Sequence, residues 1–251
     1  MRLDDLAGDL DDYLRLREEV ADPPEALNGL QVANGGEVTR LAAAVDLCEA
    51  TIEMAAHAKA DLLLVHHGLF WGGLRPLVGP SYRRVAALVS RNIAVYAAHL
   101  PLDRHPDVGN NACLARLLGV SLRGEFGSYR GAPIGVWGEL DVSRDALAGS
   151  LATTLGASAR LLPFGPKQVR RVGIVTGAGG SLIPQAAAAG LDTFITGEGP
   201  HWSFFDAEEL KINVYFAGHY ATETVGVKAL AAHVSRKYSI PWVFLDHPTG
   251  L

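Results

Sequence analysis

The sequence contains few cysteines: only Cys48 and Cys113 occur among its 251 residues. The two residues form no metal-binding or redox motif. Each lies in an apolar stretch with helical spacing, where a free thiol behaves as a small hydrophobic side chain. We therefore expect two inert core thiols.

Long apolar runs and clusters of basic residues are also absent. The apolar runs end well short of the roughly 20 residues that a membrane span needs. A formal charge of −5 and a pI of about 6.0 without basic runs argue against a dedicated nucleic-acid-binding protein. The first 20 residues carry acidic side chains throughout and lack the apolar core of a signal peptide. We expect a cytoplasmic protein without a membrane anchor.

Apolar residues make up 49% of the sequence, and their spacing alternates regularly between helix and strand patterns. Leu3, Leu6, Leu10 and Tyr13 recur at helical spacing, which predicts an amphipathic helix at the N-terminus. Runs that are apolar on both faces predict buried strands at residues 40–46, 60–65 and 93–99, with helices after each of them. This alternation is typical of a parallel or mixed sheet that helices cover on both sides.

The second half of the sequence repeats the order of the first. Residues 40–68 align without a gap on residues 171–199, and the identical positions include Asp61 with Asp192 and Gly68 with Gly199. Residues 93–99 (IAVYAAH) correspond to residues 212–219 (INVYFAGH) with one insertion. The repeat predicts an internal duplication of two similar three-layer α/β lobes, divided near residues 124–131. The predicted domains are residues 1–127 and 128–251.

Polar residues follow the strands of both halves where the strands are predicted to end. They are His66 and His67, His99 with Asp103, Glu198, and His219 with Glu223. Reactive groups in open α/β sheets gather beyond the carboxyl ends of the strands. Imidazole nitrogens and carboxylate oxygens together suit divalent metals such as Zn, Mn, Fe, Ni or Co. If the lobes face each other, these side chains predict a site for two ions in the cleft between the lobes.

Each element of this pattern has an ordinary structural alternative. Adjacent histidines can cap a strand end, and His99 with Asp103 can form a hydrogen-bonded pair at a strand exit. His219 and Glu223 stand at the i,i+4 spacing of a surface ion pair on a helix. Their joint placement at equivalent strand ends favours the metal site over three separate coincidences.

A glycine-rich segment, residues 175–184 (VTGAGGSLIP), connects a strand to a helix. Its backbone N–H groups could bind a phosphate group, with Ser181 as the helix N-cap. A tight strand-to-helix turn explains the glycines equally well. The segment has neither the P-loop nor the dinucleotide-binding pattern.

The sequence resembles the Nif-three-like dinuclear metal-centre proteins, also described as GTP cyclohydrolase I type 2 homologues. The resemblance rests on NGLQV (28–32), LLLVHHGLFW (62–71), YAAHLPLD (96–103), ITGE (195–198) and AGHYATETVGVKAL (217–230), which occur in the family's order over nearly the whole chain. The chain departs from the family's usual HHP at Gly68 and from its usual Thr-Asn-Leu-Asp at Pro101.

The resemblance implies a set of roles and an assembly. The implied metal ligands are His66, His67, Asp103, His219 and Glu223, with Glu223 bridging the two ions. His99 and Glu198 are implied to lie beside the ions or the substrate, where such groups orient ligands. Family members are similar in forming hexameric rings, so a homohexamer is expected.

Two functions are compatible with these residues. The first is a metal-dependent hydrolase of a nucleotide-like small molecule, in which His99 and Glu198 move protons. The alternative is a non-catalytic metal carrier or a regulatory scaffold that binds a protein partner. A carrier needs only ligands, whereas a hydrolase also needs an unligated base, so His99 and Glu198 favour the enzyme.

Overall fold

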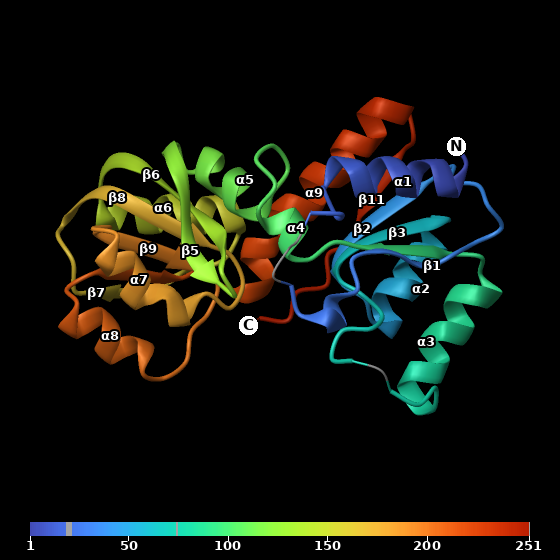
Figure 1. Cartoon of the computed structure of the whole chain (residues 1–251), viewed down its shortest axis with the longest axis horizontal. Coiled ribbons are helices and arrows are strands. Elements are labelled where there is room, and N and C mark those ends of the chain that lie inside the picture. Colours follow the sequence, from blue (N-terminus) through green and yellow to red (C-terminus); the bar gives the residue numbers. More distant parts are fainter. Residues whose placement is uncertain (19–21, 74, 251) are drawn as a thin grey trace. The chain divides into compact units, whose positions relative to one another are not determined.

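The chain folds into two compact units, each built on its own β-sheet (Figure 1). The structure is a computed structural model that describes residues 1–18, 22–73 and 75–250. The first unit consists of Met1–Leu102 and Val227–His247. The second consists of Asp103–Gly226 and the C-terminal residues from Pro248 on.

The first unit has a five-stranded sheet in the order β1-β4-β3-β2-β11. Its strands β2, β3, β4 and β11 are parallel, and β1 is antiparallel to β4. The strands are β1 (Gly29–Val32), β2 (Leu41–Asp46), β3 (Leu62–His67), β4 (Ala94–Ala97) and β11 (Trp242–Phe244). The helices are α1 (Leu3–Tyr13), η1 (Pro24–Ala26), α2 (Glu49–His57), α3 (Gly79–Ser90), the short α4 (Leu100–Asp103) and the later part of α9 (His219–Tyr238).

Helices cover both faces of this sheet. Ile52 and Ala55 of α2 and Leu88 of α3 share one apolar core with side chains of the strands. On the other face α1 buries Leu6 and Leu10, and the Tyr96 hydroxyl of β4 donates a hydrogen bond of 2.9 Å to Asp11 of α1. Figure 1 shows α1 on one side of β2 and β3, and α2 and α3 on the other side. The predicted N-terminal amphipathic helix is confirmed.

The second unit has a six-stranded mixed sheet in the order β5-β6-β8-β9-β10-β7. Its central strands β8, β9 and β10 are parallel, and the others are antiparallel to their neighbours. The strands are β5 (Ser121–Tyr129), β6 (Ala132–Ser143), β7 (Arg160–Pro163), β8 (Gln168–Val175), β9 (Thr193–Thr196) and β10 (Asn213–Phe216). The helices are α5 (Asn110–Leu117), α6 (Arg144–Leu155), η2 (Gly180–Leu182), α7 (Ile183–Ala188), α8 (Ser203–Glu209) and the first part of α9.

This sheet is also the middle of three layers. Leu114 of α5 and Leu147 of α6 pack with side chains of β8, β9 and β10 in one core. Ile183 of α7 and Ala207 of α8 pack with the opposite face of the sheet in a second core. The expected two-lobe, three-layer α/β fold is therefore confirmed.

The internal duplication is visible in the hydrogen bonds as well as in the strand order. The neighbours β2, β3 and β4 of the first sheet correspond to β8, β9 and β10 of the second. Asp61 accepts the backbone N–H groups of Thr39 and Arg40 before β2. The aligned Asp192 accepts those of residues 170 and 171 in β8. The same carboxylate thus connects the same two strands in both units.

The boundary between the units differs from the division predicted at residues 127/128. The glycine-rich stretch 124–131 is no linker, because β5 and β6 pair through it as one antiparallel hairpin. Near the C-terminus, β11 pairs in parallel with β2, with Trp242 opposite Leu41. The last strand therefore belongs to the first unit, and the second unit begins already at Asp103.

Two further sequence predictions can be compared with the fold. Among the described residues, none of the helices has the length and apolar character of a membrane span.

The two cysteines are half-buried instead of lying in a core. Burial raises the pKa of the Cys113 thiol, so this thiol stays protonated and is a poor nucleophile.

Candidate metal centre

The candidate site residues follow the carboxyl ends of neighbouring parallel strands in each unit. In the first unit His66 and His67 end β3, and His99 follows the adjacent β4. In the second unit Glu198 follows β9, and His219 follows the adjacent β10. The strand order explains why residues distant in sequence lie together, since parallel neighbours end at the same edge of a sheet.

Three histidines converge in the first unit. His66, His67 and His99 can each offer one ring nitrogen, and these nitrogens lie within 4.8 Å of one another. The ring centroids are 4.8 Å apart for His66 and His67 and 4.9 Å apart for His66 and His99. Three imidazoles at this spacing could hold a divalent metal ion.

An oxygen atom orients each of the two histidines of β3. His66 Nδ1 lies 2.8 Å from the carbonyl oxygen of Ala98, and His67 Nδ1 lies 2.8 Å from Oδ1 of Asp46. Because a carbonyl and an ionised carboxylate only accept hydrogen bonds, each Nδ1 carries a proton and donates it. The lone pair of each neutral ring is then on Nε2, which is the nitrogen that would bind a metal.

His99 is oriented in the same way but more extensively. Its Nδ1 donates to Oδ1 of Asp22 at 2.6 Å. The other oxygen of Asp22 accepts from the Asn28 side-chain amide at 2.8 Å and from the Leu100 backbone at 3.1 Å. The Asn28 side-chain oxygen accepts from the His99 backbone N–H at 2.7 Å. This network fixes both the backbone and the ring of His99.

The second unit provides a histidine between two carboxylates. His219 Nδ1 lies 2.7 Å from Oε1 of Glu198, and its Nε2 lies 3.1 Å from Oε1 of Glu223. Glu198 aligns with His67 in the repeat, and His219 aligns with His99. The two units therefore present related pairs of side chains at equivalent strand ends.

The two carboxylates change the protonation of His219. Burial by itself would lower the pKa of His219, but hydrogen bonds and charge attraction from Glu223 and Glu198 outweigh burial and raise the pKa to about 9. The histidine is therefore protonated at neutral pH without a metal. A cation that binds Nε2 must displace this proton, so metal binding is coupled to proton release.

Asp103 lies in a buried network of amide and hydroxyl groups in the second unit. Its Oδ1 accepts from the Asn110 side chain at 2.8 Å and from the Thr176 hydroxyl at 3.2 Å. Its backbone oxygen accepts from Asn111 at 3.0 Å. The family usually has an asparagine where this chain has Pro101. The side-chain amide that donates to the Asp103 carboxylate here is that of Asn110.

A glycine makes room for the His219–Glu223 pair. Gly177 has a φ of +66°, and a Cβ atom there would collide with the Glu223 carboxylate and lie 3.3 Å from His219 Nε2. Its N–H donates to Thr222 Oγ1 at 3.0 Å. Only glycine combines this backbone conformation with this close approach.

The glycine-rich segment is a tight turn whose amides are largely used within the protein. The N–H groups of Gly177, Gly179 and Gly180 donate to Thr222 Oγ1, Thr196 Oγ1 and the Glu198 carbonyl. Of the two alternatives for this segment, the tight turn therefore fits better than phosphate binding. Ser181 is not an N-cap either, because it lies inside η2, whose N-terminal flanking residue is Gly179.

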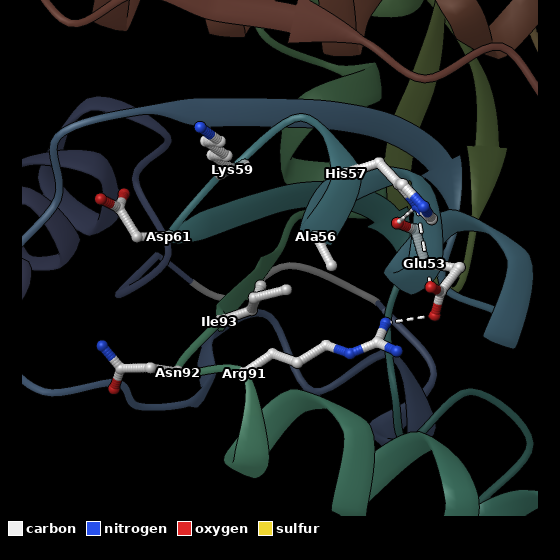
Figure 2. Close-up of a pocket in the computed structure, with 9 residues that line it drawn as sticks. Glu53, Ala56, His57, Lys59, Asp61, Arg91, Asn92 and Ile93 are labelled. Carbon is white, nitrogen blue, oxygen red and sulfur yellow. Dashed lines mark hydrogen bonds and ion pairs between the residues drawn. The ribbon is translucent and has the colours of Figure 1, made fainter.

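A separate open pocket of about 520 Å³ lies in the first unit (Figure 2). It contains Asp61, which precedes β3, whereas His66 and His67 end that strand. Figure 2 shows the Arg91 guanidinium directed at Glu53, with which it forms an ion pair. The pocket is therefore at the opposite end of β3 from the histidines. It is lined by Glu53, Ala56, His57, Lys59, Ala60, Asp61, Arg91, Asn92 and Ile93.

The structure gathers most of the predicted site residues into two groups. His66, His67 and His99 form the group of the first unit, and Glu198, His219 and Glu223 form that of the second. Asp103 sits in the adjoining amide network of the second unit. That the two groups serve the same ions stays a prediction.

The orienting partners were missed by the sequence analysis. Asp22, Asn28 and Asp46 hold His99 and His67, and Asn110 holds Asp103. A partial signal was available, because Asn28 opens the NGLQV motif and Asn110 follows Asp103 by only seven positions. Asp22 and Asp46 belong to no motif and could be identified only from the fold.

Comparisons with known proteins agree along the whole chain. The Duf34/NIF3 (NGG1p interacting factor 3) family matches residues 1–249. A protein of Deinococcus radiodurans named GTP cyclohydrolase 1 type 2 homolog is 44% identical, with 99% of this chain and 94% of the relative covered. A protein of the same name from Halobacterium salinarum is also 44% identical, with both chains fully covered.

A solved structure shares the fold at high similarity. The crystal structure of TTHA1606 from Thermus thermophilus superposes with a TM-score of 0.91 at 43% identity, and 100% of each chain is covered. The sequence, the fold and the arrangement of strand-end histidines and acids all agree with the resemblance found from the motifs. The chain belongs to the Duf34/NIF3 family.

Proposed function

We propose that this protein binds two divalent ions and hydrolyses a nucleotide-like substrate. The residues that would hold the ions are His66, His67, Asp103, His219 and Glu223. The observation that carries the proposal is the convergence of His66, His67 and His99 within 4.8 Å. Each of these rings is turned by an oxygen at Nδ1, which leaves Nε2 of His66 and His67 for a metal ion and Nε2 of His99 for a proton.

The donor set fits the proposed ions. Imidazole nitrogens and carboxylate oxygens suit zinc, manganese, iron, nickel and cobalt, and cellular availability selects among them. When bound, two such ions polarise the bond under attack and bring the pKa of water toward neutrality.

The protein's own residues would bind, orient and move protons. Asp22 holds the His99 ring so that Nε2 is the atom able to accept a proton. Glu198 accepts a hydrogen bond from His219 Nδ1, which fixes that ring for binding through Nε2. We therefore assign proton transfer to His99. We propose that Glu198 orients His219 and also accepts a proton during the reaction.

The names of the relatives support the substrate class. The curated relatives are named GTP cyclohydrolase 1 type 2 homolog, which points to a purine nucleotide whose ring is opened by water. The proposal places this reaction in the cytoplasm. It requires no nucleic acid and no membrane.

The test is turnover of a panel of purine nucleotides by protein loaded with each of the five metals. His66→Ala serves as the control, since it removes one proposed ligand. Product formation that depends on the metal and is lost in His66→Ala supports the hydrolase. Inactivity with every metal, in protein that does hold two ions, favours the metal carrier or regulatory scaffold instead.

A further inference from the structure

An exposed tryptophan packs against the histidine group of the first unit. Trp71 is 43% exposed, although large aromatic side chains are usually well buried. Its ring centroid lies 4.6 Å from that of His67 and 4.5 Å from that of His99, and the planes of the Trp71 and His99 rings cross at 62°. The indole therefore touches two candidate site residues while much of its surface remains accessible.

The loop that carries Trp71 is held firmly. Gln31 of β1 accepts the Leu69 N–H at 2.7 Å and donates to the carbonyl oxygens of residues 26 and 27. A Cβ atom at Gly68 would collide with the Gln31 amide and with the Ala97 side chain. This contact explains why the chain has glycine after the two histidines. The position of Trp71 is thus set by packing two and three residues before it.

An accessible indole at this place has a definite binding capacity. Every nucleobase has a flat π-face, and base stacking on an aromatic side chain is sequence-tolerant and substantial. A sugar phosphate or a flexible aliphatic substrate has no such face. His99 adjoins the indole, so a ring stacked on Trp71 would lie beside the proposed proton-transfer group.

We propose that Trp71 is the stacking platform for a planar heteroaromatic ring of the substrate and therefore determines substrate class. This inference rests on the proposed function, because it places the reacting base next to the histidines. It adds to that function the residue that distinguishes a nucleotide from a base-free sugar phosphate. The competing role for Trp71 is purely structural, as packing that holds His67 and His99.

The experiment compares GMP with ribose 5-phosphate, which keeps the sugar and phosphate but lacks the base. Binding of each is measured by isothermal titration calorimetry to the wild type, Trp71→Phe, Trp71→Leu and Tyr82→Leu. Tyr82 is a matched control, because it is an aromatic residue of the same unit and is 60% exposed on α3. The metal content of each protein is measured in parallel by elemental analysis.

The proposal predicts that Trp71→Leu weakens GMP binding about tenfold or more, that Trp71→Phe weakens it less, and that Tyr82→Leu leaves it unchanged. Ribose 5-phosphate should bind all four proteins alike, and the metal content should stay constant. Equal GMP affinity in the wild type and Trp71→Leu would overturn the proposal. Loss of metal in Trp71→Leu would also overturn it, in favour of the structural role.

Failure of the proposed function gives a different result. Wild-type protein that holds no metal contradicts the metal site, whereas the comparison of GMP with ribose 5-phosphate still tests Trp71 by itself. Wild-type protein that holds two ions but prefers GMP no more than ribose 5-phosphate contradicts the stacking platform and leaves the metal site standing.

Discussion

The three strand-end histidines of the first unit present Nε2 because oxygen atoms hold their Nδ1 atoms. Asp46 turns His67, Asp22 turns His99, and the Ala98 carbonyl turns His66. A histidine without such a partner can rotate or adopt the other tautomer, which places a proton on the donor atom. These partners are therefore part of the site although they would not touch an ion.

Removal of Asp46 should weaken metal binding without unfolding the protein. Loss of such an orienting partner typically lowers metal affinity 10–100-fold, so we expect a decrease of about that size in Asp46→Ala. The affinity can be measured by competition with a chromophoric chelator. Asp141→Ala is the control, because it also removes one carboxylate, at the exposed ion pair with Arg170. Equal affinity in the two variants would exclude an orienting role for Asp46.

Gly177 should tolerate no side chain. An alanine at a φ of +66° costs about 1–2 kcal/mol, and its Cβ would also displace the Glu223 carboxylate. We expect Gly177→Ala to lower both the free energy of unfolding and the metal content. Gly119→Ala separates the two effects, since Gly119 has a φ of +75° and open space around it. It should lose stability but keep its metal, as urea titration and elemental analysis can show.

Among single residues, the candidate metal-binding side chains could be predicted from the sequence, whereas the residues that orient them could not. His66 and His67 were singled out because they follow a predicted strand, and His219 and Glu223 because they repeat the spacing of His99 and Asp103; the family resemblance then implied their role as ligands. Asp22 lies 77 positions from His99, and Asp46 lies 21 positions from His67. Such pairs arise from the fold, and no local pattern marks them.

Hydrogen bonds between helices position the candidate site residues of the second unit. Helix α9, which provides His219 and Glu223, is fixed by the Asn110 side chain at the start of α5. Asn110 Oδ1 accepts the Gly226 N–H at 2.7 Å, and its amide donates to Asp103 at 2.8 Å. One asparagine thus positions a candidate ligand and the helix that bears two others.

Gly226→Ala should therefore destabilise the protein even though it lies within a helix. Alanine favours a helix over glycine by about 1 kcal/mol, but a Cβ at residue 226 would collide with the side chain and backbone of Asn110. Overpacking of this kind typically costs about 1–3 kcal/mol, so we expect a net loss in urea denaturation. Gly149→Ala in α6, with no atom within 4 Å, should instead gain stability. A gain in both variants would refute the proposed packing of α9.

Elements with continuous apolar runs were predictable, and those without them were not. Strands β2, β3 and β4 are buried on both faces and lie within two residues of the predicted ranges, although β3 also includes His66 and His67. The hairpin of β5 and β6 was missed because β5 is mostly exposed and contains Gly124 and Gly127, which suggested a linker. The N-cap at Ser181 was wrong because a 3-10 turn precedes α7.

The whole molecule contains two copies of one α/β design. The repeat places the candidate metal-binding side chains at corresponding strand ends. The duplication could be predicted because Asp61 and Asp192 keep the same role in both units. The boundary between the units could not, because the pairing of β11 with β2 joins residues about 200 positions apart. Nothing near Trp242 in the sequence indicates this partner.

We also propose that the protein forms a homohexamer, as the family resemblance implies. Helix α8 and its flanking residues expose several large apolar side chains, which supports burial against a second copy of the chain. We expect light scattering to give six times the chain mass, and Phe205→Asp to lower it. Val89→Asp on α3 is the control at another exposed apolar residue. A monomeric wild type would contradict the hexamer. The exposed residues are Trp202, Phe204, Phe205 and Leu210.

The most direct test of the central claim is the number of ions per chain in two double variants, measured by elemental analysis with the fold checked by circular dichroism. One variant, His66→Ala/His67→Ala, removes donors of the first unit, and the other, His219→Ala/Glu223→Ala, removes donors of the second. Because the account has both groups holding the same two ions, it predicts two ions in the wild type and a loss of both in each variant. One ion retained at full affinity in each folded variant would mean separate sites and would contradict the account.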